Sequence, residues 1–310
     1  MKHTGLWAQK MDRRDRGHVV PVSGTVESSV EAAELIAIAE RFSAAGADDR
    51  REAFRTLLSS LKTAKDAGWM EGLAAALRLA LNPMLDYTSA QSLNRFYKLL
   101  PALVRGRSKL RLAMLGGFTT RQLRDLIELY LFAANISAEI YEADYGVFRQ
   151  EIFDPSSGLY RFEPDTIFLA TNWRNLGSTP ALSHTPQEVR DLLDKEYGDW
   201  SLLWQTAHDR SGSQILQNNF DTPPWRALGN HEGRHAAAMT RFISDFNRRL
   251  AVRVPSYVTI HDVDALAANI GRRAWGDDAC TAPCTATGLQ TGEGAGNTAT
   301  SLARRRSSVG

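Results

Sequence analysis

Residues 109–117, KLRLAMLGG, predict a β-strand that ends in a glycine turn. Residues 165–171, DTIFLAT, predict a second strand, and their almost continuous apolar character is typical of a parallel strand covered on both faces. Between these strands an amphipathic helix begins after Thr119 or Thr120, and either residue is suited to cap it. This order of elements predicts an α/β fold.

Strand and helix patterns alternate along the rest of this region. Further strands are predicted at residues 138–141, 213–218 and 256–262, and helices at 186–206, 231–252 and 263–270. Five such units predict a doubly wound, flavodoxin-like, mainly parallel five-stranded sheet. Because ligands of such sheets bind at the carboxyl ends of the strands, the segments of interest are 116–120, 141–145, 171–175, 218–220 and 262–264.

The flanking segments have a different pattern. Residues 1–27 are polar and mixed in charge, and we expect a disordered leader. Residues 28–106 contain four amphipathic stretches, which predict an all-helical N-terminal layer with a kink or an end at Pro101. Residues 107–278 form the predicted α/β domain. Residues 279–310 contain no aromatic residue and are rich in Thr, Ala, Gly and Ser, which predicts a disordered tail.

The overall composition argues against several classes of protein. The 310 residues include 37 Lys and Arg and 35 Asp and Glu, a net charge of +2, which gives no electrostatic basis for nucleic acid or an anionic membrane as the main partner. No apolar run is long enough to span a bilayer, and residues 1–20 lack the apolar core of a secretory signal. Cys280 and Cys284 do not make a disulfide framework. We therefore expect a cytoplasmic protein.

Eight short motifs follow one another along the chain: LAMLGGFTT at 112–120, YEADY at 141–145, DPSSGL at 154–159, EPD at 163–165, LQNNF at 216–220, LGN at 228–230, DVDAL at 262–266 and GRRAWGD at 271–277. In this order they resemble the N-terminal module of FkbH-like proteins, which belong to subfamily IIIC of the HAD superfamily. The resemblance covers residues 95–278. It implies an SGNH-hydrolase-like fold, followed in full-length relatives by a HAD domain.

The resemblance also implies a role in biosynthesis. In full-length relatives the HAD domain loads a glyceryl unit from a phosphoglycerate donor onto an acyl carrier protein, in pathways of the polyketide type. The implied partner is therefore an acyl carrier protein or its acyl-pantetheine group. The HAD nucleophile motif D-x-D-x-T is absent from the sequence, and DVDAL at 262–266 has Leu266 in place of the threonine.

Three expectations follow from the missing motif. Magnesium is expected only in the missing HAD domain, and this chain is expected to hold no cofactor. We also expect a frameshift or truncation just after Asp278, where relatives continue towards the HAD motif. That expectation fails if the downstream nucleotide sequence holds no HAD-coding frame.

An SGNH hydrolase needs a nucleophilic Ser, a His base oriented by an Asp, and oxyanion donors from a Gly and an Asn. Phe118 falls at the Ser position here, and Thr119 next to it offers a hydroxyl, although capping of the following helix is the interpretation that we favour. His261 is the candidate base and Asp262 the neighbouring carboxylate, with a loop contact and helix capping as their favoured structural roles. The candidate oxyanion and crevice residues are Gly116, Gly117, Gly146 and Asn172.

Residues 231–235, HEGRH, match the zinc motif H-E-x-x-H within a predicted helix. Gly233 disfavours that helix and no third ligand follows at the required spacing, so we expect no metal site.

Two functional interpretations follow. The favoured one is a non-catalytic or accessory module of an FkbH-like protein. The alternative is an ester hydrolase in which Thr119 is the nucleophile and His261 the base.

Overall fold

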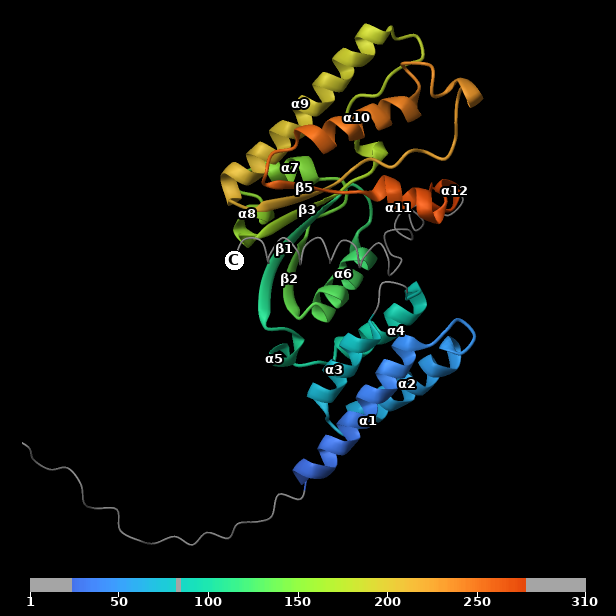
Figure 1. Ribbon diagram of the computed structural model, residues 1–310. Helices are drawn as coiled ribbons and strands as arrows, with labels where there is room; N and C mark the ends of the chain where they lie inside the picture. Colours follow the sequence, from blue (N-terminus) through green and yellow to red (C-terminus); the bar gives the residue numbers. More distant parts are fainter. Residues whose placement is uncertain (1–23, 82–84, 277–310) are drawn as a thin grey trace, which may run out of the picture.

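A five-stranded parallel sheet forms the centre of the computed structural model, which describes residues 24–81 and 85–276. Its strands are β1 (Ser108–Gly116), β2 (Ile136–Glu142), β3 (Thr166–Ala170), β4 (Gln214–Asn218) and β5 (Val258–His261). Their order is β2-β1-β3-β4-β5, and every neighbouring pair is parallel (Figure 1). The predicted doubly wound sheet is therefore confirmed. Because β2 and β3 lie on opposite sides of β1, the topological switch point lies between β1 and β3.

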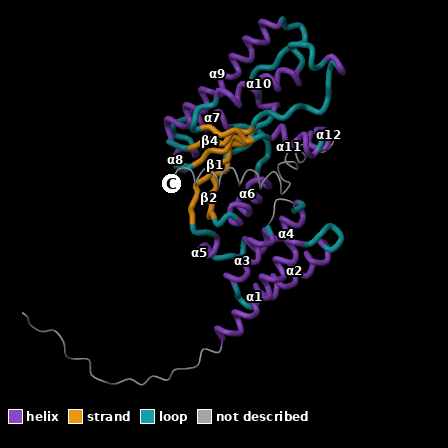
Figure 2. The backbone as a smooth tube through the Cα atoms, in the orientation of Figure 1, coloured by secondary structure: helices purple, strands orange, loops and turns teal. Residues whose placement is uncertain are grey.

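Helices cover both faces of the sheet (Figure 2). One face carries α6 (Arg121–Ala133) and α11 (Val263–Ile270), and the other carries α7 (Phe148–Phe153), α8 (Gly158–Phe162), α9 (Pro186–Ser211) and α10 (Met239–Arg253). Successive strand residues face opposite cores, as Phe168 and Leu169 of β3 do. This burial on both faces explains the continuous apolar run of β3.

The N-terminal region is helical, as predicted, and packs against the outer side of α6. Its helices are α1 (Gly24–Ala44), α2 (Arg50–Asp66), α3 (Met70–Ala80), α4 (Tyr87–Tyr97) and α5 (Ala102–Arg105). The Tyr97 hydroxyl donates a hydrogen bond to Glu128 of α6 (2.9 Å), and the Arg78 guanidinium lies 4.4 Å from the centre of the Phe132 ring. One apolar core therefore continues from α1 to the sheet.

Two helix boundaries in the N-terminal region differ from the predictions. α1 begins at Gly24, inside the predicted leader. Residues 1–23 of the leader and the whole predicted tail, including Cys280 and Cys284, lie outside the described residues. The helix predicted to begin at residue 90 begins at Tyr87, because the Asp86 carboxylate caps it by accepting a hydrogen bond from the Ser89 amide (2.9 Å). The predicted helix end near Pro101 is confirmed, since α4 ends at Tyr97 and Pro101 precedes the separate helix α5.

A third difference lies before α10. The helix predicted to begin at residue 231 begins at Met239, and a 3₁₀ turn (Gly229–His231) and further turns precede it. The buried Glu232 carboxylate accepts hydrogen bonds from the amides of Leu228 (3.0 Å) and Thr240 (3.3 Å), which ties both ends of this segment together. The short helices α7, α8 and α12 (Arg272–Gly276) were not predicted. Of the helices in the described ranges, none has both the length and the apolar character needed to cross a membrane.

Candidate functional site at the carboxyl edge of the sheet

The glycine turn after β1 packs tightly against its neighbours. A Cβ atom at Gly116 would lie 2.7 Å from both the Phe118 carbonyl oxygen and the Thr120 Cγ2 atom, so a side chain does not fit there. The Gly117 amide donates a hydrogen bond to the Ala170 carbonyl at the end of β3 (3.0 Å), and the Gly146 amide donates one to the Gly116 carbonyl (3.1 Å). Two of the predicted oxyanion donors are therefore already bonded to backbone oxygens.

Asn175 lies against Gly117 at the switch point of the sheet. Its Nδ2 donates to the Gly117 carbonyl (3.4 Å), and its Oδ1 accepts a hydrogen bond from the Asn172 amide (2.9 Å). A Cβ atom at Gly117 would collide with this side chain. The Asn172 Oδ1 accepts from the Arg174 amide (3.0 Å) and so caps the 3₁₀ turn Trp173–Asn175. Asn172 was predicted as a site residue but Asn175 was not, because its contact with Gly117 joins residues far apart in the chain.

Thr119 is exposed at the carboxyl edge of the sheet, beside the ends of β1 and β2. It lines a cavity of about 250 Å³ together with Phe118, Thr120, Arg121, Glu142, Ala143, Asp144 and Tyr145. The N-cap position of α6 belongs to Thr120, whose hydroxyl makes no capping bond and donates instead to Glu142 (2.6 Å). The predicted side-chain cap on this helix is therefore wrong, because the hydroxyl of Thr120 joins the ends of β1 and β2.

His261, at the end of β5, is buried, with 5% of its surface exposed. Its Nδ1 lies 3.0 Å from the Oδ1 of Asn218, and the Nδ2 of Asn218 donates to the Thr171 carbonyl (3.2 Å). Because this second bond fixes the Asn218 oxygen towards the imidazole, Nδ1 carries the hydrogen and Nε2 is the acceptor. Nε2 is buried and has no hydrogen-bond partner among the described residues, and burial lowers the pKa of His261 to about 4. The imidazole is therefore neutral at pH 7 and makes no hydrogen bond with Thr119.

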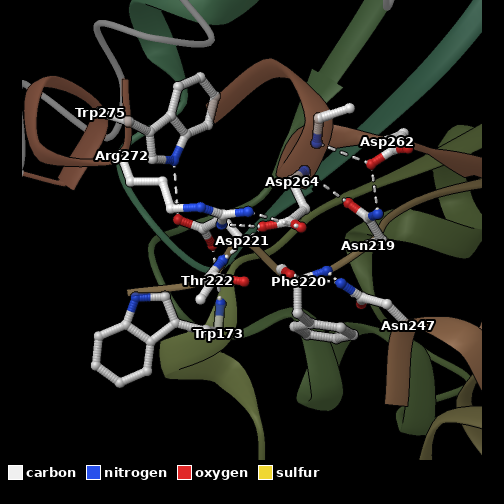
Figure 3. Close-up of polar contacts among 11 residues, drawn as sticks. Trp173, Asn219, Phe220, Asp221, Thr222, Asn247, Asp262, Asp264, Arg272 and Trp275 are labelled. Atoms are coloured by element: carbon white, nitrogen blue, oxygen red, sulfur yellow. Dashed lines mark hydrogen bonds and ion pairs between the residues drawn. The ribbon is translucent and has the colours of Figure 1, made fainter. Parts of the chain in front are cut away.

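Asp262 caps α11. Its Oδ1 accepts hydrogen bonds from the Ala265 amide (3.0 Å) and from Nδ2 of Asn219 (2.7 Å), and the Oδ1 of Asn219 accepts from the Asp264 amide (3.0 Å) (Figure 3). The favoured structural interpretation of Asp262 as a helix cap is confirmed. Asn219 therefore binds the first turn of α11 through both atoms of its amide group.

Two further carboxylates, Asp221 and Asp264, lie beside this cap (Figure 3). Although burial raises the pKa of Asp264, hydrogen bonds from Arg272 (2.5 and 3.3 Å) and from the Thr222 amide (2.8 Å) bring it below its usual value. Asp221 accepts from the Trp275 indole (2.8 Å) and the Trp173 amide (3.2 Å), and its burial raises its pKa. These contacts join the loops after β3 and β4 to α12.

Residues 111–286 match the family model described as FkbH, N-terminal domain, and the match covers more than half of the 310 residues. The chain belongs to this family. A comparison with curated proteins gives no match. The resemblance found in the sequence motifs is therefore confirmed at the level of the family.

Two solved structures align with this FkbH N-terminal domain. The N-terminal part of the protein BF1531 from Bacteroides fragilis aligns with a TM-score of 0.55 and 18% identity, over 69% of this chain and 55% of that one. This chain thus spans little more than half the length of that structure. The C-terminal catalytic domain of peptidoglycan O-acetyltransferase A from Streptococcus pneumoniae aligns with a TM-score of 0.33 and 14% identity, over 66% of this chain and 96% of that one. At 18% identity, the similarity to the Bacteroides fragilis structure shows a shared fold alone.

The described carboxylates at the carboxyl edge of this FkbH N-terminal domain do not fit a metal ion. Asp262 is bound to an amide side chain and a helix end, and Asp264 is paired with Arg272. In the described part of the chain, no three His, Cys, Asp or Glu side chains come together as a metal site. His231 and His235 of the H-E-x-x-H match lie in turns before α10 and not on an α-helix. The carboxylate of Glu232 between them is buried and already accepts hydrogen bonds from the amides of Leu228 and Thr240, so it is not free to act as the base that the zinc motif requires.

Proposed function

We propose that this FkbH N-terminal domain is an accessory module of a glyceryl-loading system of polyketide-type biosynthesis. In this account it binds an acyl carrier protein or the acyl-pantetheine group of that protein, while a HAD-type phosphatase domain performs the chemistry. Membership of the family supports the account. The related Bacteroides fragilis structure is described as containing a phosphatase domain complexed with Mg, which agrees with it.

The observation that carries the proposal is that polar groups at the carboxyl edge already have partners within the fold. The amides of Gly117, Gly146 and Asn172 donate to other groups of the chain, and an oxyanion hole requires donors that are free for the substrate. The Asp262 carboxylate caps a helix, and the buried His261 does not line the cavity that contains Thr119. This pattern supports an accessory role better than hydrolysis.

The proposal is tested by titrating the full chain with an acyl carrier protein in a calorimeter. We expect saturable binding of the holo form, which carries phosphopantetheine, with a dissociation constant in the micromolar range. The apo form is the matched control, because it presents the same protein surface without the prosthetic group. If neither form binds, the proposal is wrong; a difference between the two forms assigns part of the affinity to the pantetheine group.

Ester hydrolysis is the second candidate function, and one observation favours it. Thr119 is exposed and lines a cavity of about 250 Å³ at the carboxyl edge, where substrates of doubly wound sheets bind. Catalysis would need a base within about 3 Å of the hydroxyl, or one water away from it. His261 does not line this cavity, so the hydrolase would need a movement of β5 or a different base.

A further inference from the structure

The two long helices α9 and α10 lie side by side over one face of the sheet (Figure 1). A groove of about 490 Å³ lies between them. Apolar side chains from both helices line it, including the buried Val189 and Leu193 of α9 and Val252 of α10, of which 80% is exposed. On α10 the lining positions 241, 245, 248 and 252 follow one another at helical spacing. They form one stripe of the helix, distinct from the buried stripe that packs on the sheet.

Positive charge surrounds this apolar strip. The lining residues that the structure describes include four arginines and one carboxylate, Asp245, which pairs with both Arg241 (3.6 Å) and Arg248 (3.0 Å). Arg249 pairs with Asp194 and thereby joins the two helices. Arg190 donates to the neutral side chain of Gln187. The groove therefore has a net positive charge and exposed guanidinium groups on both sides.

We propose that this arginine groove, between α9 and α10, binds an acidic amphipathic helix of a partner protein. A helix laid along the groove would cover Val252 with its apolar side and place carboxylates beside Arg190, Arg241 and Arg248. Positions 241 to 252 of α10 extend over about 16 Å, which corresponds to three turns of a bound helix. The inference goes beyond the proposed function, because it assigns a surface and the chemistry of its occupant without requiring a carrier protein.

Other occupants fit the groove less well. The segments of this chain outside the described residues, 1–23 and 277–310, are not acidic: the first has more basic than acidic residues and the second has equal numbers of each. A nucleic acid would make contact through phosphates and would leave the apolar strip unused. A second copy of the chain could offer Glu31 and Glu34 of α1, which are exposed, and the experiment below distinguishes that case.

The test uses a synthetic helical peptide of about three turns, with leucines on one face and glutamates on the others, bound to the full chain and measured by fluorescence anisotropy. A peptide with lysine in place of each glutamate is its control. We expect saturable binding of the acidic peptide that weakens at high salt. The double variant Arg190→Glu and Arg248→Glu is expected to weaken binding by about tenfold or more, because it replaces two attractive contacts by repulsive ones.

Matched variants distinguish peptide binding in the groove from attraction to the overall charge of the protein. Arg51→Glu with Arg55→Glu changes the charge equally at exposed positions of α2, and is expected to leave peptide affinity unchanged. Val252→Ser removes the apolar contact without changing charge, and is expected to weaken binding. Unfolding curves check that each variant is folded.

Several results would overturn the proposal. These are no binding of the acidic peptide, equal binding of the lysine peptide, or an affinity unchanged by the double variant. Tighter binding of a single-stranded DNA oligonucleotide would assign the groove to nucleic acid instead. Self-association of the chain that the double variant abolishes, measured by light scattering, would assign it to a second copy.

Discussion

Asp221→Ala is expected to lower the free energy of unfolding by about 3–5 kcal/mol. The Asp221 side chain is 2% exposed and accepts hydrogen bonds from the Trp275 indole (2.8 Å) and the Trp173 amide (3.2 Å). Without the carboxylate, two N–H donors lose their acceptor, and each such loss costs about 1–3 kcal/mol. The cavity left in place of the carboxylate adds to this cost. Urea unfolding at pH 7, followed by circular dichroism, measures the change.

Two variants make this result specific. Trp275→Phe keeps an aromatic side chain but loses the five-membered ring of the indole with its N–H, which is one of the two donors, so we expect a smaller loss than for Asp221→Ala, of about 1–2 kcal/mol. Asp48→Ala removes an exposed carboxylate of the loop between α1 and α2 and is expected to change stability by less than about 0.5 kcal/mol. A loss from Asp221→Ala as small as that from Asp48→Ala would show that the contacts between α12 and the loops after β3 and β4 do not form.

The second large effect concerns pH. Burial lowers the pKa of His261 from 6.5 to about 4. Between these values the unfolded chain takes up a proton that the folded chain does not, so the stabilising contribution of His261 is complete above pH 6.5 and is lost as the pH falls towards 4. Below pH 4 both states are protonated and no further loss follows. The difference in pKa corresponds to about 3 kcal/mol.

His261→Asn isolates this contribution. The Asn amide nitrogen takes the place of Nδ1 and keeps a donor for the Asn218 oxygen, but it does not titrate. Unfolding free energies of both proteins are measured from pH 7 to pH 4, and the wild type is expected to lose about 3 kcal/mol more than the variant. Comparing the two proteins removes the contribution of Asp221, whose raised pKa acts in the opposite direction. Parallel pH profiles would show that His261 takes up its proton at the same pH in the folded and the unfolded protein. The side chain would then not be buried as described.

The architecture of the sheet could be predicted from the sequence because its central strands, β1, β3 and β4, are buried by both helical layers. The apolar runs of β1 and β3 and the glycine turn at residues 116–117 carry that information locally. The short helices α7 and α8 were missed because six and five residues are too few for a helical period to stand out. The late start of α10 depends on Glu232, whose role as an acceptor for two amides cannot be read from its neighbours in the chain.

The location of the candidate site residues could be predicted from the sequence, but the hydrogen bonds that they make could not. Thr119, Asn172, His261 and Asp262 all lie at the carboxyl ends of strands, as the alternation of elements predicts. Their partners, such as Asn175, Asn218 and Asn219, are amide side chains, which occur in many loops and give no distinctive pattern. The motifs that include Asn219 and Arg272 were recognised as motifs, but the packing of α11 and α12 that brings these two residues to Asp264 is a property of the folded chain.

An ester-hydrolysis assay tests most directly whether the carboxyl edge of this domain has an accessory role. The full chain, Thr119→Ala and Thr119→Ser are each incubated with p-nitrophenyl esters of short and medium chain length, and release of nitrophenol is followed against buffer. The account predicts no turnover above buffer for any of the three proteins, because the main-chain amides of Gly117, Gly146 and Asn172 and the Asp262 carboxylate are already bonded within the fold. Turnover by the wild type that Thr119→Ala abolishes and Thr119→Ser retains would contradict it and identify a hydrolase.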